Sequence, residues 1–451
     1  MRSGRRFGAQ VSDSGGSQMI SVKEIREDVG RMKANLSARG LSFDLDRFLS
    51  LYDDVKSHKQ KIEEVQCKLN AVSKIIKDGL WKDDSQSMLS DASVLKGYIL
   101  RAKESYNLLI EEFDLLSRQL PNWTSPDVPV GKTDDDNLTI KYKGQIPEFD
   151  FSHKDHVQLG QELDLIDFDS GTKVAGSKFY FLKNQAVFLQ HALKSFIFNK
   201  ALRAGFTPLQ TPDVSFNHIL EGVGFAPKGD ESNTYGLEGL DKSLIATAEI
   251  CVAGMHAGEV IDESRLPLLY IAESHCFRRE AGASGRSSKG LYRVHQFEKL
   301  ELFVICKPED SAKYHDKILE LQEEIYGELG IPYKVVINCT GDLGAPAYKK
   351  YDIEAWMPGK GIAGEYGEIT SASNCTDYQA RRLNIKYRDS ASKTNRYVHT
   401  LNGTASALGR TMVAILENYQ CADGSVKMPE ALKRYLDFDQ IAPVVNDSHR
   451  A

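Results

Sequence analysis

Arginine and glutamate residues flank a glycine-rich loop in the stretch 276–301. The segment 276–280 reads Cys-Phe-Arg-Arg-Glu, glycines follow in the next ten residues, and the segment 291–301 alternates apolar and polar side chains. This pattern predicts two antiparallel strands joined by a hairpin loop. Arg278 and Arg293 would stand on these strands, and a guanidinium group binds phosphate oxygens as a two-pronged fork. The stretch therefore predicts a site for a polyphosphate.

Arg410 is a second candidate for phosphate binding. It follows a run of small residues, 400–409, and stands at the start of an amphipathic helix that contains Val413 and Leu416. A guanidinium at the start of that helix could meet a phosphate tail.

The stretch 184–214 contains elements that could position such a site. Apolar residues recur at helical spacing (Ala186, Leu189, Leu193, Phe196), and a short segment then ends at Pro212. We expect a long helix that leads into a strand, a common α/β arrangement that by itself says little about function.

The three blocks together resemble the motifs of class II aminoacyl-tRNA synthetases: helix-strand-proline, Phe-Arg-x-Glu with a loop and a distal Arg-x-x-x-Phe, and a helix that starts with Gly-Arg. The amino-acid sequence is similar to that of seryl-tRNA synthetases over nearly the whole stretch from Leu95 to Ile441. Further matches lie at 164–168, 175–177, 247–249, 341–344 and 368–382.

The resemblance implies which residues surround a serine substrate: Thr247, Ala248, Glu249, Glu301 and Thr404. The carboxylates of Glu249 and Glu301 would accept hydrogen bonds from the ammonium and hydroxyl groups. Alanine would leave these acceptors unpaired, which could give discrimination on the order of 10⁴ without editing. Relatives usually have serine where this chain has Thr404, so an added methyl group would narrow the pocket.

The resemblance also implies an ATP site formed by Arg278, Arg279, Glu280, Arg293, Phe297, Glu368, Ile369, Thr370, Ser371 and Arg410. Arg278 would bridge the serine carboxylate and the α-phosphate, Glu280 would contact the adenine amino group, and Phe297 would stack on adenine. Arg293 and Arg410 would hold the outer phosphates. We expect Arg278, Glu301 and Arg410 to be the catalytic residues.

Glu368 and Ser371 resemble the family's Mg²⁺ ligands, a pairing that suits a cation that prefers hard oxygens and keeps several waters. We expect Mg²⁺ to arrive with ATP, and no zinc. The implied chemistry needs neither a protein nucleophile nor a general base, because the carboxylate of serine itself attacks the α-phosphorus.

Two apolar seams before Pro121, joined by a segment that contains Gly79 and polar residues 82–87, predict an antiparallel coiled coil. The first runs from Phe48 to Ile76 and the second from Leu95 to Leu120, both with alternating spacings of three and four residues. At about 1.5 Å per residue, each helix would reach roughly 40 Å and would project from the body. The lysines on the hairpin could belong to a solvated surface, the hairpin could be an oligomerisation element, or the lysines could bind a phosphate backbone through ionic contacts.

The sequence as a whole predicts an α+β protein: a class II antiparallel β-sheet flanked by helices, with a long N-terminal coiled-coil arm. The expected parts are a disordered extension over 1–18, a tRNA-binding arm over 19–122, a linker over 123–150 and a catalytic domain over 151–451. With 451 residues, the chain is too long for one compact core.

The resemblance implies ATP, L-serine and tRNA(Ser) as partners, and tRNA(Sec) is a further candidate. The unit before Pro212 would form a homodimer interface, and the arm would reach the long variable arm of the tRNA. Two rival functions remain open: a ligase that loads serine onto a carrier protein, which should lack the arm, and a non-catalytic RNA-binding homologue. The segment Pro121-Asn122-Trp123 departs from the family's usual Pro-Asn-Ile-Pro.

Bulk properties favour a cytoplasmic enzyme. No apolar run approaches the roughly 20 residues of a membrane helix. The seven cysteines are scattered and never spaced as Cys-x-x-Cys, which argues against disulfides and zinc. The net charge of −6 gives no hint of nucleic acid. Residues 1–18 hold three arginines and one acid, so a mitochondrial or other organellar presequence is the alternative.

Three groups of residues have more than one interpretation. His153 and His156 flank Asp155 and superficially resemble metal ligands, although we expect a helix start there. Cys375 with Asp377 could suggest a nucleophile, but no paired histidine is near in sequence, so a packing role is preferred. Arg286 and Lys289 could be solvated charges or contacts to the acceptor stem of a tRNA.

Overall fold

The computed structural model describes residues 20–78, 85–225, 233–280 and 289–443. Three expectations lie outside these residues: the extension at 1–18, the turn of the hairpin at Gly79, and the part of the glycine-rich loop with Arg286. Contact density divides the chain into two units, of which one holds most residues up to Pro121 and the other holds 122–451 with the short segment 38–40. In the part of the chain that the structure describes, no helix is both long and apolar enough to cross a membrane.

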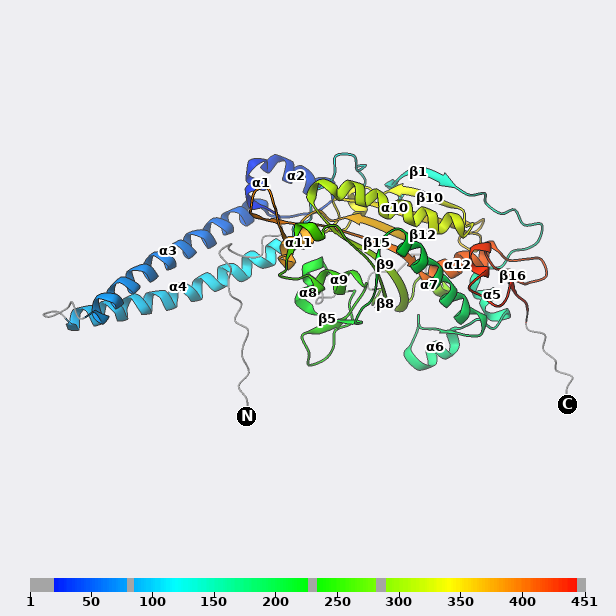
Figure 1. The fold of residues 1–451 in the computed structure, drawn as a ribbon, viewed down its shortest axis with the longest axis horizontal. Coiled ribbons are helices and arrows are strands. Elements are labelled where there is room, and N and C mark those ends of the chain that lie inside the picture. The colour runs from blue at the N-terminus through cyan, green and yellow to red at the C-terminus, as the bar shows by residue number, and fades with distance from the viewer. Residues whose placement is uncertain (1–19, 79–84, 226–232, 281–288, 444–451) are drawn as a thin grey trace. The chain divides into compact units, whose positions relative to one another are not determined.

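The first unit is helical. It contains two short helices and two long ones: α1 (Val22–Glu27), α2 (Val29–Ala38), α3 (Leu45–Lys77) and α4 (Ser85–Gln119). Helices α3 and α4 lie side by side as a hairpin (Figure 1). Asp44 caps α3, because its carboxylate accepts a hydrogen bond from the backbone N–H of Arg47 at 2.9 Å.

The two predicted seams meet between α3 and α4. At one end of the hairpin the rings of Phe48 and Phe113 stack with their centroids 5.1 Å apart. Farther along, Leu69 of α3 is buried in one cluster with Ala92 and Ile99 of α4. The seam residues of the two helices therefore pack against each other, which confirms the predicted coiled coil, while other apolar residues of α4, such as Leu100 and Leu108, are exposed.

The second unit is built on an eight-stranded sheet in the order β1-β10-β11-β12-β15-β9-β8-β4. The strands are β1 (Leu138–Lys143), β10 (Tyr333–Ile337), β11 (Lys349–Met357), β12 (Glu365–Asn374), β15 (His399–Ala407), β9 (Gln296–Cys306), β8 (Leu268–Phe277) and β4 (Thr207–Gln210). All neighbours pair antiparallel except β4 and β8 at one edge. The predicted antiparallel sheet is thus confirmed, with one parallel pair added.

Helices cover both faces of this sheet (Figure 1). On one face, α7 (Gln185–Arg203), α10 (Ser311–Glu328) and α12 (Leu408–Asn418) pack against Leu300, Leu302 and Val304 of β9. On the other face, α8 (Asn217–Val223), α9 (Glu249–Met255) and α11 (Tyr378–Leu383) pack against Phe303 and Ile305. Successive residues of β9 alternate between the two cores, as the period of two in a strand requires.

Smaller elements complete the second unit. They are the strands β2 (Ile166–Asp167), β3 (Phe181–Leu182), β5 (Val214–Phe216), β6 (Lys242–Leu244), β7 (Val260–Asp262), β13 (Lys386–Arg388), β14 (Asn395–Tyr397), β16 (Val426–Lys427) and β17 (Gln440–Ile441), and the helices α5 (His156–Glu162), α6 (Phe168–Ala175) and α13 (Glu430–Lys433). The stretch 123–150, for which we predicted a linker, contributes β1 to the edge of the main sheet.

Candidate active site

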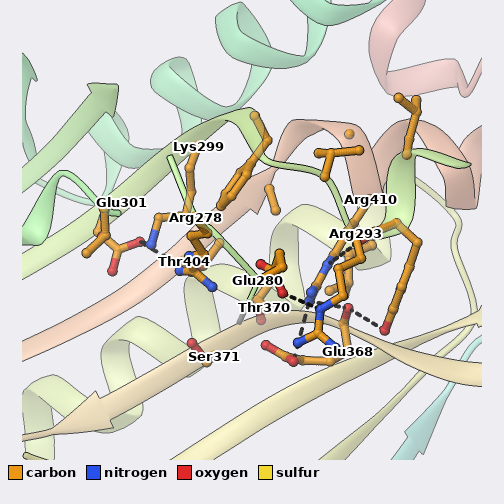
Figure 2. Close-up of a pocket in the computed structure, with 18 of the residues that line it drawn as sticks. Arg278, Glu280, Arg293, Lys299, Glu301, Glu368, Thr370, Ser371, Thr404 and Arg410 are labelled. Atoms are coloured by element: carbon orange, nitrogen blue, oxygen red, sulfur yellow. Dashed lines mark hydrogen bonds and ion pairs between the residues drawn. The ribbon is translucent and has the colours of Figure 1, made fainter. Parts of the chain in front are cut away.

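A cavity opens on the face of the sheet that carries the start of α9. The alternation of β9 places Phe297, Lys299 and Glu301 on this face, and Thr404 of β15 lies directly opposite Glu301. Asn402 reaches the same cavity from β15, two residues before Thr404. The floor of the cavity is therefore made of paired strands, with a shift of register in β15 between Thr404 and Ser406, and Figure 2 shows side chains from neighbouring strands converging above it.

Glu301 is the most fully engaged acid of the cavity. Its side chain is 1% exposed, and its Oε2 atom lies 2.6 Å from the Nζ atom of Lys299, which is itself 6% exposed. The hydroxyl of Thr404 donates to Oε2 at 3.2 Å, and the amide of Asn402 donates to Oε1 at 3.4 Å. A buried carboxylate with three such partners is fixed in place, and the lysine compensates its charge.

Glu249 is the first residue of α9 and lies nearby in the same cavity. The amide of Gln379 donates to its Oε1 atom at 2.5 Å, and Gln379 is held in turn by the hydroxyl of Thr400 at 2.7 Å. Burial, together with the negative charge of Glu301, raises the pKa of Glu249 to about 7. The charges of Lys299 and Arg278 offset only part of the cost of placing these two carboxylates together, so a further cation would stabilise the ionised form of Glu249.

Arg278 lies between this acidic end and the rest of the cavity (Figure 2). Its guanidinium carbon is 5.3 Å from the centroid of the Phe297 ring, and its Nε and Nη2 atoms donate to the carbonyl of Ala246 at 3.4 Å. The ring of Phe297 lies against one face of the guanidinium, and the carbonyl of Ala246 binds one of its edges. The rest of this planar cation is directed into the cavity.

The far end of the cavity is lined by charges that pair with one another. The Nε atom of Arg293 donates to Oε2 of Glu280 at 2.5 Å. Arg410, near the start of α12, donates to the carbonyls of Tyr292 (3.2 Å) and Glu368 (2.9 Å). Figure 2 shows both arginines at the end of the cavity that carries Glu368.

Glu368 stays ionised at this end. Desolvation opposes ionisation, but the positive charges of Arg410, Lys350 and Arg278 outweigh it and lower the pKa of this carboxyl below its ordinary value. Its side chain is 48% exposed, so a carboxylate is presented to the cavity and not sealed beneath it. Ser371 lines the cavity on the same strand, β12.

The structure brings together most of the residues that the sequence predicted. Lining the cavity are Thr247, Glu249, Arg278, Glu280, Arg293, Phe297, Glu301, Glu368, Ile369, Thr370, Ser371, Thr404 and Arg410. Ala248 and Arg279 do not line it: Ala248 is fully buried, and the backbone N–H of Arg279 donates to the carbonyl of Asn233.

Sequence reasoning assigned no role to eight further lining residues: Phe225, Leu291, Tyr292, Val294, Lys299, Asn402, Ala407 and Gly409. The alternation of β9 could have found Lys299, which stands between Phe297 and Glu301 at a spacing of two. The same spacing on β15 relates Asn402 to Thr404. Nothing in the sequence marks Phe225, which comes from the end of α8.

The residues with more than one interpretation have specific partners. Burial raises the pKa of the Cys375 thiol well above its ordinary value, and the charge of Glu249 adds to this effect, so the thiol is a poor nucleophile. Lys289 forms an ion pair with Asp155. His153 bonds to the carbonyl of Pro358 at 3.1 Å, and both ring nitrogens of His156 are engaged within the protein.

Two family models match the chain. Residues 19–124 match the seryl-tRNA synthetase N-terminal domain, and residues 237–419 match the tRNA synthetase class II core domain (G, H, P, S and T). The two matches cover the helical hairpin and six of the eight strands of the main sheet, without β1 and β4.

Individual relatives match over nearly the whole chain. The serine–tRNA ligase of Treponema denticola is 51% identical over 94% of this chain and 100% of the relative. The crystal structure of seryl-tRNA synthetase from Pyrococcus horikoshii complexed with ATP superposes with a TM-score of 0.84 at 40% identity, covering 94% of this chain and all of that one. The cytoplasmic serine–tRNA ligase of Naegleria fowleri in complex with AMP gives a TM-score of 0.80 at 29% identity, covering 95% and 98% of the two chains.

Proposed function

We infer the function of this chain from the premise that it belongs to the seryl-tRNA synthetase family. It is a ligase, and we propose that it activates L-serine with ATP and transfers the seryl group to the 3′ end of tRNA(Ser). The observation that carries this proposal is the cavity itself, in which a buried acidic end and an arginine-rich end lie on either side of Arg278.

The acidic end is proposed to bind serine. The ammonium group of serine would bind near the carboxylates of Glu249 and Glu301. Both carboxylates are buried, and a positive charge beside them would stabilise their ionised forms. The hydroxyl of serine would bond within the set that includes Thr247, Glu301 and Thr404. Because these groups are buried, an alanine substrate would leave one of them without its partner, and this cost would reject alanine.

The other end is proposed to bind ATP. Arg278 would contact both the serine carboxylate and the α-phosphate, and Phe297 would lie against the adenine ring. Arg293 and Arg410 would take the outer phosphates, so the ion pair between Arg293 and Glu280 must open as ATP enters. Release of Glu280 at that moment frees its carboxylate for the adenine amino group. Arg279 and Ala248 would act through their backbone and packing, since neither lines the cavity.

Mg²⁺ is proposed to accompany ATP, with Glu368 and Ser371 as its protein ligands. The fit rests on the donor chemistry: a half-exposed, ionised carboxylate and a hydroxyl lie on one strand, β12, at the phosphate end of the cavity. When bound, the ion would neutralise charge on the phosphate oxygens. Glu368 would then exchange part of its pairing with Arg410 for the metal.

The proposed chemistry has two displacement steps. A carboxylate oxygen of serine forms a bond to the α-phosphorus while the bond to the pyrophosphate oxygen breaks, which gives seryl-adenylate. A hydroxyl at the 3′ end of the tRNA then attacks the carbonyl carbon of the adenylate, and AMP leaves. The chain's part is to align the reactants and to balance the negative charge with Arg278, Arg293 and Arg410.

The hairpin of α3 and α4 is proposed to bind the long variable arm of tRNA(Ser), through exposed lysines such as Lys56, Lys61 and Lys68. tRNA(Sec) is a candidate for the same surface. The parts 19–122, 123–150 and 151–451 are proposed as arm, connection and catalytic domain. We place the enzyme in the cytoplasm, and fusion of residues 1–18 to a reporter would test the organellar alternative.

A homodimer is proposed through the elements that precede Pro212. Helix α7 and strand β3 expose large apolar side chains, among them Phe188 (63% exposed) and Phe181 (46%). Exposed apolar residues of this size, gathered on one unit, are typical of an interface. Light scattering would give twice the monomer mass if the proposal is right and the monomer mass if it is wrong.

The decisive experiment is ATP–pyrophosphate exchange by the purified protein with serine, alanine or threonine, followed by charging of tRNA with and without its variable arm. We expect exchange with serine alone and charging that requires the variable arm. Exchange without charging of any tRNA would favour a carrier-protein ligase. No exchange with any amino acid would contradict the enzyme assignment and favour an RNA-binding homologue.

A further inference from the structure

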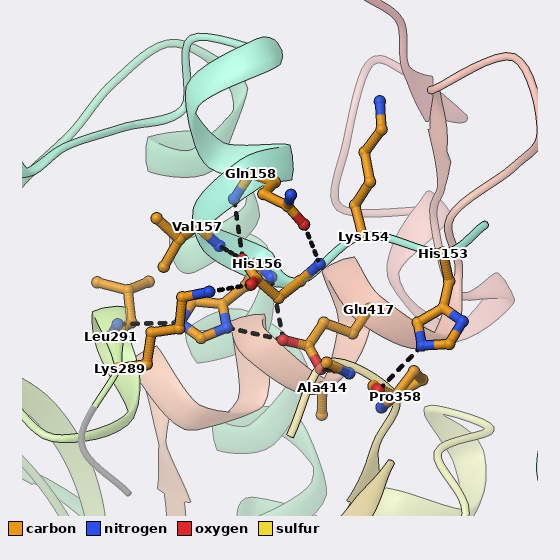
Figure 3. Close-up of polar contacts among 12 residues, drawn as sticks. His153, Lys154, His156, Val157, Gln158, Lys289, Leu291, Pro358, Ala414 and Glu417 are labelled. Carbon is orange, nitrogen blue, oxygen red and sulfur yellow. Dashed lines mark hydrogen bonds and ion pairs between the residues drawn. The ribbon is translucent and has the colours of Figure 1, made fainter. Parts of the chain in front are cut away.

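His156 forms a buried hydrogen-bonded junction outside the cavity. It is the first residue of α5 and is 5% exposed. Its Nδ1 atom lies 2.7 Å from Oε1 of Glu417, and its Nε2 atom lies 3.2 Å from the backbone nitrogen of Leu291. Figure 3 shows the imidazole ring between these two partners.

The proton positions on His156 follow from its partners. The backbone N–H of Leu291 can only donate, so Nε2 must carry a lone pair and accept. The proton of the neutral ring is therefore on Nδ1, from which it is donated to the carboxylate of Glu417. Because both nitrogens are engaged in this way, the ring is a fixed acceptor aimed at Leu291.

Glu417 holds the ring from the other side. Its side chain is 1% exposed, and its two oxygens accept from the backbone N–H of His156 at 3.0 Å, from the His156 ring, and from the backbone N–H of Gly359 at 2.8 Å. Three N–H donors satisfy this buried carboxylate. Glu417 also belongs to the last turn of α12, the helix whose first turn carries Arg410.

The segment that His156 holds is one wall of the cavity. Leu291 and the three residues that follow it all line the cavity, and Leu291 is 2% exposed. Tyr292 receives a hydrogen bond from Arg410 on its carbonyl, and its ring lies 4.6 Å from the guanidinium carbon. The position of Leu291 therefore decides where Tyr292 meets Arg410.

The fit at the start of this wall is close. Gly290 has a φ of +59°, and a Cβ atom at this position would lie 2.1 Å from Nε2 of His156. Lys289 forms an ion pair with Asp155, the residue that caps α5. The backbone at 289–291 is thus pressed against the start of α5, and His156 supplies its hydrogen-bond acceptor.

We propose that His156 is a positioning residue for ATP: its Nε2 atom holds the wall 291–294 against Arg410, and through Glu417 it joins that wall to the helix that carries Arg410. This inference rests on the proposed assignment of the arginine-rich end of the cavity to ATP. His156 touches no substrate in this scheme, and its effect reaches ATP through Leu291 and Tyr292.

Two substitutions separate the two hydrogen bonds of the ring. The amide of asparagine reaches about as far as Nδ1, so His156→Asn keeps a donor for Glu417 and loses the acceptor for Leu291. The amide of glutamine reaches about as far as Nε2, so His156→Gln keeps an acceptor for Leu291. The neighbouring His153, which bonds to Pro358 and lies on the same segment, provides the matched control as His153→Ala.

The readouts are KM for ATP, KM for serine and kcat in serine-dependent ATP–pyrophosphate exchange, with thermal unfolding of each variant. We expect His156→Asn to raise KM for ATP about tenfold, because the buried N–H of Leu291 loses its acceptor. KM for serine should stay within about twofold, since the serine end does not touch this wall. His156→Gln and His153→Ala should keep KM for ATP within about twofold of the parent.

Equal KM values for ATP in His156→Asn and the parent would overturn the proposal, as would an equal rise in His156→Asn and His156→Gln. A merely structural role would lower the melting temperature and the active fraction, and therefore kcat, without moving KM for ATP. Arg410→Ala separates this inference from the site assignment. If Arg410→Ala raises KM for ATP and His156→Asn does not, only the inference fails; if Arg410→Ala has no effect, the ATP assignment fails with it.

Discussion

The two ends of the cavity are held in different ways. At the acidic end, which we propose binds serine, Glu301 is 1% exposed and is held by Lys299 on its own strand and by Thr404 on the neighbouring strand. At the arginine-rich end, which we propose binds ATP, Glu368 is 48% exposed, and the arginines there are paired with acids that also line the cavity. At the first end the carboxylate is buried and held by neighbouring strands, whereas at the second end the charges are held in pairs that a substrate can replace.

This difference matches the role that we propose for each end. Discrimination between serine and alanine depends on buried groups that cannot move to find a new partner, and a strand floor provides that. Binding of a triphosphate with its cation depends on charges that change partners, and the segments beside the glycine-rich loop provide those. If the comparison is correct, substitutions at the two ends should separate KM for serine from KM for ATP.

Glu301→Gln should have the largest effect, because it removes one charge of a buried ion pair and leaves Lys299 unpaired. We expect kcat/KM for serine to fall by about 10³ in the exchange assay while KM for ATP changes less than about threefold. Glu298→Gln, on the same strand with its neighbour Lys194 at the other face, is the control for β9 itself. An unchanged KM for serine in Glu301→Gln would show that the serine end is assigned to the wrong carboxylate.

Arg410→Lys should have the next largest effect, at the opposite end. Lysine keeps the charge but cannot donate at once to the carbonyls of Tyr292 and Glu368 as the guanidinium does. We expect kcat/KM for ATP to fall by about 10² with KM for serine nearly unchanged. A loss that falls equally on serine and ATP would mean that the two ends act as one unit and would contradict the comparison.

A dependence on pH should separate the ends again. The pKa of Glu249 is raised to about 7 in the folded protein, from an ordinary value of 4.5, by burial and by Glu301, against the opposing effects of Gln379, Lys299 and Arg278. The folded protein therefore binds the proton of Glu249 more tightly than the unfolded chain does. The contribution of this carboxyl to the free energy of unfolding declines as pH rises from about 4.5 to about 7.

Serine binding should follow the reverse order, because its ammonium group needs the ionised carboxylate. We expect KM for serine to rise about tenfold per unit as pH falls below about 7, with KM for ATP nearly flat. The measurement is the ratio of KM for serine to KM for ATP in the exchange assay between pH 5.5 and 8. Glu249→Gln is the control, in which this ratio should no longer depend on pH. A slope that persists in Glu249→Gln would assign the titration to another group.

Patterns within one element predicted much of this molecule. The three-and-four spacing located both helices of the hairpin, although α4 begins ten residues before the predicted Leu95, because Ala92 serves as a seam residue and is too small to stand out. On β9, the family resemblance implied the roles of Phe297 and Glu301, and the alternation of the strand places both side chains on one face. The same rule includes Lys299, but a lysine on a buried face has a meaning only once its carboxylate partner is known.

Contacts between distant segments could not be predicted in this way. His156 and Glu417 are 261 residues apart, and Leu291 is 135 residues from His156, so no periodicity relates them. The sequence drew attention to His156 only as an unconvincing metal ligand. Likewise, the pairing of Glu280 with Arg293 depends on how the two segments on either side of the glycine-rich loop meet, and the rearrangement that we propose for ATP binding follows from this pairing and not from a sequence motif.

The smallest effect is expected at Thr404, where the two properties of the side chain can be removed separately. Thr404→Ser keeps the hydroxyl that donates to Glu301 and removes only the methyl group, so KM for serine should change less than about threefold. Thr404→Val keeps the shape and removes the hydroxyl, so Glu301 loses one donor and KM for serine should rise about tenfold. Both values come from the exchange assay at saturating ATP. If Thr404→Ser had the larger effect, the methyl group would be shaping the pocket more than the hydroxyl does, and the serine end would be held by packing and not by its hydrogen bonds.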